Sequence, residues 1–130
     1  IPVDRTRGFI SALKMAGKVL SEGNILFIHP EGTRSDDGEI HEFKRGVGFL
    51  AELFRCPVIP VYIDGGHEFW PKNSLLPKSF HKIKVVFGQP LQTEEIISEH
   101  EDYSDLLKAK IITEKLKEEI ERLSQHPIGK

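Results

Sequence analysis

Three segments of the chain repeat apolar residues at the spacing of an amphipathic helix. The spacing predicts helices over residues 7–21, 44–55 and 104–124, each with one apolar face turned to a core. The residues that form these faces are Phe9, Leu13, Ala16 and Leu20; Val47, Leu50, Ala51 and Phe54; and Ile112, Leu116, Ile120 and Leu123. Gly23 and Asn24 supply a stop after the first helix.

Short apolar runs between these helices predict strands. Residues 25–29 are apolar almost throughout, which is typical of a central strand in a parallel sheet, and residues 57–63 and 82–87 predict two more. Pro60 cannot donate to a sheet ladder, so it indicates an edge, a bulge or a strand end. The alternation of strands and helices predicts an α/β layered domain with a mostly parallel sheet flanked by helices.

Composition and charge narrow the class of protein. The 130 residues, 38% apolar and 29% charged, suffice for one globular domain, which we expect to span residues 1–130. The net charge of -2 gives no support for nucleic-acid binding. The six histidines show no metal-ligand spacing, so we expect neither a metal nor a bound cofactor. The oligomeric state stays open.

A polar run, Pro30 to Ser35, follows the first predicted strand. Open α/β sheets place ligand sites at the carboxyl ends of their strands. In this run Arg34 offers a planar donor fork that fits a phosphate, and Gly32 permits a tight turn. Glu31 can accept hydrogen bonds from sugar or glycerol hydroxyls, or hold an arginine in place. The candidate binding residues of this run are Glu31, Gly32, Thr33 and Arg34. A surface turn with an incidental ion pair is the alternative.

Further groups could lie close to this run. Asp4 and Arg5 end another apolar stretch, and Lys44 and Arg45 open a helix, whose free N–H groups favour an anion. We take Arg5 as a further phosphate-binding residue, with Asp4, Ser35, Lys44 and Arg45 as possible supports. The loop at 67–82 mixes lysines with large apolar residues, which could border an acyl chain, insert into a bilayer interface or fold onto the sheet. The candidate contacts are Phe69, Trp70, Leu75 and Leu76.

Taken together, these blocks resemble the glycerolipid acyltransferases, of the lysophosphatidate acyltransferase type. The matching blocks, in the family's order, are Val3-Asp4-Arg5, then Pro30 through Ser35 with Phe43-Lys44-Arg45-Gly46, then Val58-Ile59-Pro60-Val61-Tyr62. The resemblance is strongest over residues 1–90, whereas 91–130 form a helical C-terminal part. His29 stands where the family usually has an aromatic residue.

The resemblance implies transfer of a fatty acyl group to the free hydroxyl of lysophosphatidate or a related glycerophospholipid, in phospholipid biosynthesis. Acyl-CoA or acyl carrier protein would be the co-substrate and acyl donor. Arg5 and Arg34 would hold the acceptor's phosphate, and Glu31 would contact its glycerol part. The family's histidine, in a His-x4-Asp block, acts as general base on the hydroxyl.

That catalytic block does not precede the other blocks in this sequence. We therefore expect the histidine–aspartate pair upstream of Ile1, an N-terminally truncated fold, no catalytic residue within the chain, and no activity of the chain alone. His100 and Asp105 share the spacing, but they lie far downstream in an acidic stretch where chance accounts for it. We expect the enzyme at the cytoplasmic face of a membrane, peripheral or anchored by the missing N-terminal part.

Two other functions remain open from the sequence. The chain could be a non-catalytic module that binds lipid phosphate or acyl-CoA, or a sugar-phosphate enzyme that uses the same Glu-Gly-Thr-Arg run. An in-frame Asn-His-x4-Asp upstream of Ile1 would favour the acyltransferase. The acceptor lipid, the acyl length and the donor type are not determined by these residues.

Overall fold

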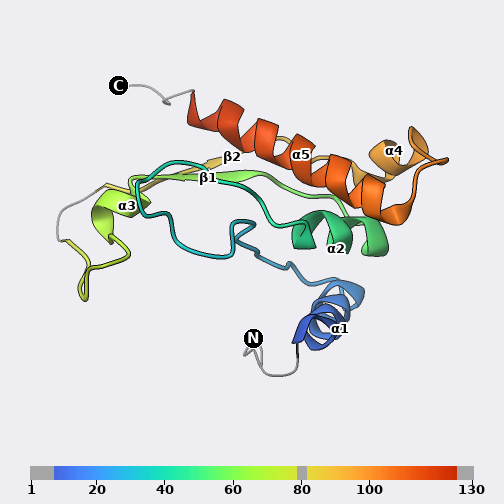
Figure 1. Ribbon diagram of the computed structural model, residues 1–130, viewed down its shortest axis with the longest axis horizontal. Coiled ribbons are helices and arrows are strands. Elements are labelled where there is room, and N and C mark those ends of the chain that lie inside the picture. Colours follow the sequence, from blue (N-terminus) through green and yellow to red (C-terminus); the bar gives the residue numbers. More distant parts are fainter. Residues whose placement is uncertain (1–7, 79–81, 126–130) are drawn as a thin grey trace.

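The computed structural model of the chain describes residues 8–78 and 82–125. Its elements are α1 (Gly8–Ser21), α2 (Gly46–Phe54), β1 (Val61–Asp64), α3 (Gly66–Phe69), β2 (Lys84–Phe87), α4 (Thr93–Ser98) and α5 (Asp105–Ser124). Figure 1 shows α5 running along the two strands, with α2 and α4 near its first turns and α3 at the far end of the molecule.

The three helices predicted from apolar spacing are confirmed as α1, α2 and α5, with ends within two residues of those expected. The apolar faces are buried as predicted where they meet one another: Ala51 of α2 is 1% exposed, and Ile112 of α5 is fully buried. Ser104 caps α5, its hydroxyl accepting a hydrogen bond from the backbone N–H of Leu107. The spacing of apolar residues was sufficient to predict these helices, because a helix makes its backbone hydrogen bonds within itself.

The core lies between α2, α4 and α5. Ala51 packs with Ile112 and with Ile96 and Ile97 of α4, and a second cluster joins Val47, Leu116 and Ile120. Gly48 lets α2 approach the backbone of α5 closely, beside the carbonyl of Ala109 and the hydroxyl of Thr113. This packing fixes α2, and with it the basic residues that precede α2, against the rest of the fold.

The sheet differs from the prediction. Among residues 8–78 and 82–125 it has two strands, and β1 pairs with β2 antiparallel, with Val61 opposite Phe87 and Asp64 opposite Lys84. A bridge between Val58 and Leu91 extends the pairing beyond the two strands. Two residues lie between Val58 and Val61, whereas three lie between Phe87 and Leu91, and one extra residue on one side is the pattern of a β-bulge. The predicted mostly parallel sheet is therefore not found in this part of the chain.

Residues 25–29 show why the parallel sheet is not confirmed in the described residues. They were predicted as a buried central strand, yet Ile25 is 93% exposed and Phe27 is 62% exposed. The segment has no regular secondary structure and belongs to neither β1 nor β2. An apolar run becomes a strand only when a neighbouring strand pairs with it, and a run of residues does not say whether that neighbour is present.

Two short helices were not predicted. Gly65, in the left-handed conformation at φ 79°, turns the chain into α3 (Gly66–Phe69), which overlaps the start of the predicted loop at 67–82. Helix α4 is anchored by Thr93, whose hydroxyl donates to the Cys56 carbonyl at 2.7 Å. The strand predicted over residues 57–63 is found as β1, which begins only at Val61, directly after Pro60, where the sequence indicated an edge, a bulge or a strand end. No helix in the described ranges is both long and apolar enough to cross a bilayer.

Candidate functional site

The Glu-Gly-Thr-Arg run forms a tight turn that two backbone hydrogen bonds close. The N–H of Gly32 donates to the His29 carbonyl at 3.1 Å, and the N–H of Lys44 donates to the Pro30 carbonyl at 2.8 Å. Gly32 has φ 72°, a backbone conformation that costs little only for glycine. The glycine at this position is therefore required by the turn, as the sequence indicated.

Lys44 lies against this turn. A Cβ atom built on Gly32 would stand 2.7 Å from the Lys44 ammonium nitrogen, so that side chain covers the face that glycine leaves open. Arg45 takes the N-cap position of α2 and makes no side-chain capping hydrogen bond. The structure thus brings Lys44 to the turn and sets Arg45 at the positive end of α2.

Arg34, two residues after Gly32, reaches the loop after α3. Its guanidinium carbon lies 5.4 Å from the centre of the Trp70 ring, and its Nη2 atom donates to the Lys72 carbonyl at 3.4 Å. Trp70 is itself held by a hydrogen bond from its ring N–H to the Ser74 carbonyl at 3.0 Å. The run at 30–35 and the loop at 67–82, predicted separately, therefore form one surface.

A polar cluster that the sequence did not single out follows the turn. Asp37 Oδ1 accepts hydrogen bonds from the Glu39 N–H at 3.0 Å and from His41 Nε2 at 2.8 Å, and it lies 2.9 Å from Ser35 Oγ. These bonds, the backbone one first, lower the pKa of Asp37 to about 2. The bond to Asp37 in turn raises the pKa of His41 above its usual value.

The cluster stabilises a loop and is not arranged for nucleophilic catalysis. Asp37 stands between the other two side chains, so the histidine does not contact the Ser35 hydroxyl, as a general base would have to do. Ser35 also accepts a hydrogen bond from the Gly38 N–H at 2.9 Å. The sequence signal for this cluster was weak, because an aspartate four residues before a histidine in a polar loop is a common pattern.

The remaining candidate residues are more scattered. Glu31 is half-buried in the turn, and Thr33 is exposed, its hydroxyl 3.4 Å from the Arg34 carbonyl. Leu75 and Leu76 are 95% and 76% exposed, whereas Phe69 ends α3 and is half-buried. The predicted residues Asp4 and Arg5 lie outside the described residues.

The structure also bears on the two histidines discussed above. His100 lies just past the end of α4, its Nδ1 atom 2.8 Å from the Ile96 carbonyl of that helix, and Asp105 pairs with Lys108. His29 stacks edge-on against Phe27, with ring centres 5.0 Å apart. Within residues 8–78 and 82–125, no three side chains of the metal-ligating types gather at one place.

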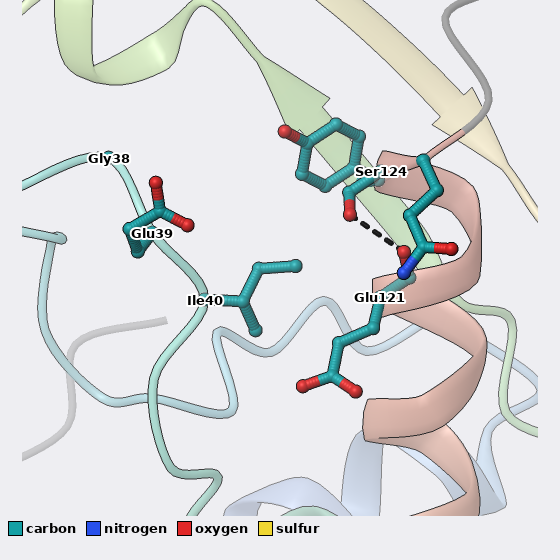
Figure 2. A pocket seen from close by; sticks show the side chains of 7 residues that line it. Gly38, Glu39, Ile40, Glu121 and Ser124 are labelled. Atoms are coloured by element: carbon teal, nitrogen blue, oxygen red, sulfur yellow. Dashed lines mark hydrogen bonds between the residues drawn. The ribbon is translucent and has the colours of Figure 1, made fainter.

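A small hollow of about 200 Å³ opens between the loop after the turn and the end of α5, and Figure 2 shows it. Its lining residues are Gly38, Glu39, Ile40, Tyr62, Glu121, Ser124 and Gln125. Burial, followed by the carboxylates of Asp64, Glu39 and Glu68, raises the pKa of Tyr62. A hollow lined by carboxylates and no cation does not suit a phosphate, so the turn with Lys44 and Arg34 is the better candidate site.

Comparisons with known proteins agree with the resemblance seen in the sequence. A profile of the Acyltransferase family matches residues 1–64. A 1-acyl-sn-glycerol-3-phosphate acyltransferase of Limnanthes alba is 32% identical over 82% of this chain and 39% of its own length. The enzyme of the same name from Bacillus subtilis is 33% identical over 69% of this chain and 42% of its own.

A solved structure leads to the same family. The 1-acyl-sn-glycerophosphate (LPA) acyltransferase PlsC from Thermotoga maritima matches with a TM-score of 0.62 and 27% identity, over 88% of this chain and 45% of that one. The chain thus spans less than half the length of these relatives. Sequence, profile and structure agree, and the chain belongs to the glycerolipid acyltransferase family, of the lysophosphatidate acyltransferase type.

Proposed function

We propose that this chain contributes the acceptor-binding half of an enzyme that acylates lysophosphatidate or a related glycerophospholipid. The acyl group would come from acyl-CoA or acyl carrier protein. The acceptor's hydroxyl oxygen attacks the thioester carbonyl carbon, the carbon–sulfur bond breaks, the thiol leaves, and a base takes the hydroxyl proton. The names of the relatives support the acceptor class, because each is a 1-acyl-sn-glycerol-3-phosphate acyltransferase.

The observation that carries the proposal is the pair of cations at the Gly32 turn. Lys44 lies against the turn, and Arg34 projects from its end with one hydrogen bond, to the Lys72 carbonyl, among the described residues. A guanidinium has five N–H donors, so most remain for a bidentate contact with a phosphate. The Lys44 ammonium adds a point charge on a flexible side chain at the same turn.

Glu31 would take the uncharged part of the acceptor. Its carboxylate lies one residue before Gly32 and is half-buried, so it can accept a hydrogen bond from the free glycerol hydroxyl of the acceptor. Trp70 supports the site indirectly, because the ring under Arg34 limits where the guanidinium can move. We infer that these residues hold the acceptor still, which supplies the positional part of the rate.

The base is expected from the His-x4-Asp block of the family, which does not precede the turn in this sequence. The first test is therefore the genomic sequence upstream of the codon for Ile1. An in-frame Asn-His-x4-Asp there supports an enzyme whose acceptor site is the Gly32 turn. A stop codon or an unrelated domain there favours a binding module instead.

The second test measures acyl transfer by the full reading frame that contains this chain. Arg34→Lys keeps the charge but loses the fork, so the KM for lysophosphatidate should rise by about tenfold, and Arg34→Ala should raise it further. Arg55→Lys is the matched control, because Arg55 pairs with Glu94 at 2.7 Å, beyond the C-terminal end of α2. An unchanged KM in Arg34→Ala would contradict the proposal. Inhibition by a soluble sugar phosphate, with no acyl-chain preference, would favour the sugar-phosphate enzyme.

A further inference from the structure

The loop after α3 exposes the two most solvent-accessible leucines described. Leu75 is 95% exposed and Leu76 is 76% exposed, and Trp70 beside them is 44% exposed. We call residues 70–78 the leucine loop. In Figure 1 it projects from the end of the molecule that carries α3, away from α4 and the first turns of α5. These apolar side chains therefore face outward on a protrusion rather than toward the core.

The leucine loop is folded by its own hydrogen bonds. The Ser74 N–H donates to the Pro71 carbonyl at 3.0 Å, and the Ser74 hydroxyl donates to the Leu76 carbonyl at 2.6 Å. The Lys78 N–H closes the loop on the Phe69 carbonyl at 2.7 Å. Backbone groups that already have partners cost less to remove from water, so this loop can enter a less polar phase with its leucines first.

Along the sequence, the charged residues of the loop and of the segment after it are all basic. The chain has no aspartate or glutamate between Glu68 and Glu94, whereas Lys72, Lys78, Lys82 and Lys84 all fall in that interval. Lys72 pairs with Asp36 and Lys84 pairs with Asp64. Lys78 and Lys82 are exposed and have no carboxylate partner among the described residues, so their charge is available to an external anion.

We propose that the leucine loop docks the protein on an anionic lipid bilayer, with Leu75 and Leu76 in the interfacial region and Lys78 and Lys82 at the lipid phosphates. Two leucines on a narrow tip offer far less than the roughly 800 Å² per partner of a standard protein interface. They do suit a bilayer, where apolar tips and flanking lysines act together. The proposal does not depend on the acyl-transfer reaction.

Trp70 makes the test specific, because it is the chain's one tryptophan and belongs to the loop. Its emission would be followed as the full chain is mixed with vesicles of phosphatidylcholine alone or with added phosphatidylglycerol, free of any lysolipid. We expect a blue shift with the anionic vesicles that weakens as salt is added. Vesicle sedimentation at the same time gives the partition coefficient.

Three variants separate the contributions. Leu75→Ala with Leu76→Ala should weaken partition by about tenfold or more, since each change removes apolar surface that would be buried. Lys78→Gln with Lys82→Gln should weaken it by roughly tenfold on anionic vesicles only. The control is Leu106→Ala, because Leu106 is 59% exposed at the start of α5, at the other end of the molecule, and should leave partition unchanged.

Several results would overturn the proposal. Vesicle binding without a change in Trp70 emission would assign the membrane contact to another surface. An equal loss of partition in Leu106→Ala and in the leucine-loop double variant would show a general apolar effect. A blue shift that grows with protein concentration in the absence of lipid would identify a second copy of the chain as the occupant of the loop.

Discussion

Gly48 offers the sharpest test of how the core positions the site. Replacing it by alanine would place a methyl group against α5, in contact with the Ala109 carbonyl oxygen and the Thr113 hydroxyl, and 2.9 Å from the Ala109 carbonyl carbon. Carbon and oxygen atoms ordinarily approach no closer than about 3.3 Å. Since Ala109 presents backbone atoms, no side chain can rotate aside, and α2 must move away from α5.

Two opposing effects set the size of the change. Overpacking a core typically costs about 1–3 kcal/mol, and the backbone contact at Gly48 argues for the upper end. Alanine stabilises a helix interior by up to about 1 kcal/mol relative to glycine. The net loss should therefore be about 2 kcal/mol, which for a chain of this length lowers the melting temperature by roughly 8 °C.

Thermal and urea unfolding followed by circular dichroism would measure this loss. Gly46→Ala is the matched control, because it lies in the same helix and a Cβ atom built there meets nothing within 4 Å. That variant should melt at or slightly above the unchanged chain. If Gly48→Ala melted as high as Gly46→Ala, with the same dependence on urea, the close contact between α2 and α5 would be refuted.

Two further predictions concern the turn and the loop after it. Gly32→Ala, at φ 72°, and Gly23→Ala, at φ 75° with open space around it, should each lose roughly 1–2 kcal/mol of stability in urea through backbone strain, because the Lys44 side chain near Gly32 can move aside. An unchanged stability of Gly32→Ala would contradict the left-handed conformation at the turn. In an NMR titration His41 should have a pKa above 6.5, and Asp37→Asn should lower it. The stability that His41 contributes is then complete below pH 6.5 and is lost as the pH rises through its folded-state pKa. The stability that Asp37 contributes is present above pH 3.8 and is lost as the pH falls toward about 2. A His41 pKa that is not raised would contradict the hydrogen bond between His41 and Asp37.

The sequence indicates candidate residues for the site, but it does not indicate their contacts. The run from Glu31 to Arg34 was recognised from its residues and its place after an apolar stretch, and the comparisons confirmed the family that it indicated. That Arg34 would lie over Trp70, 36 residues further along the chain, was not predicted. Neither was the hydrogen bond between Asp37 and His41, because such a pattern in a polar loop has no distinctive spacing.

The sequence by itself determined what depends on near neighbours in the chain. Helices α1, α2 and α5 follow from apolar spacing, and the turn at Gly32 follows from a residue that tolerates positive φ. Only the tertiary structure decided the antiparallel pairing of β1 with β2 and the unpaired state of residues 25–29. The physical reason is that a helix completes its hydrogen bonds within itself, whereas a strand depends on a partner from a distant part of the chain.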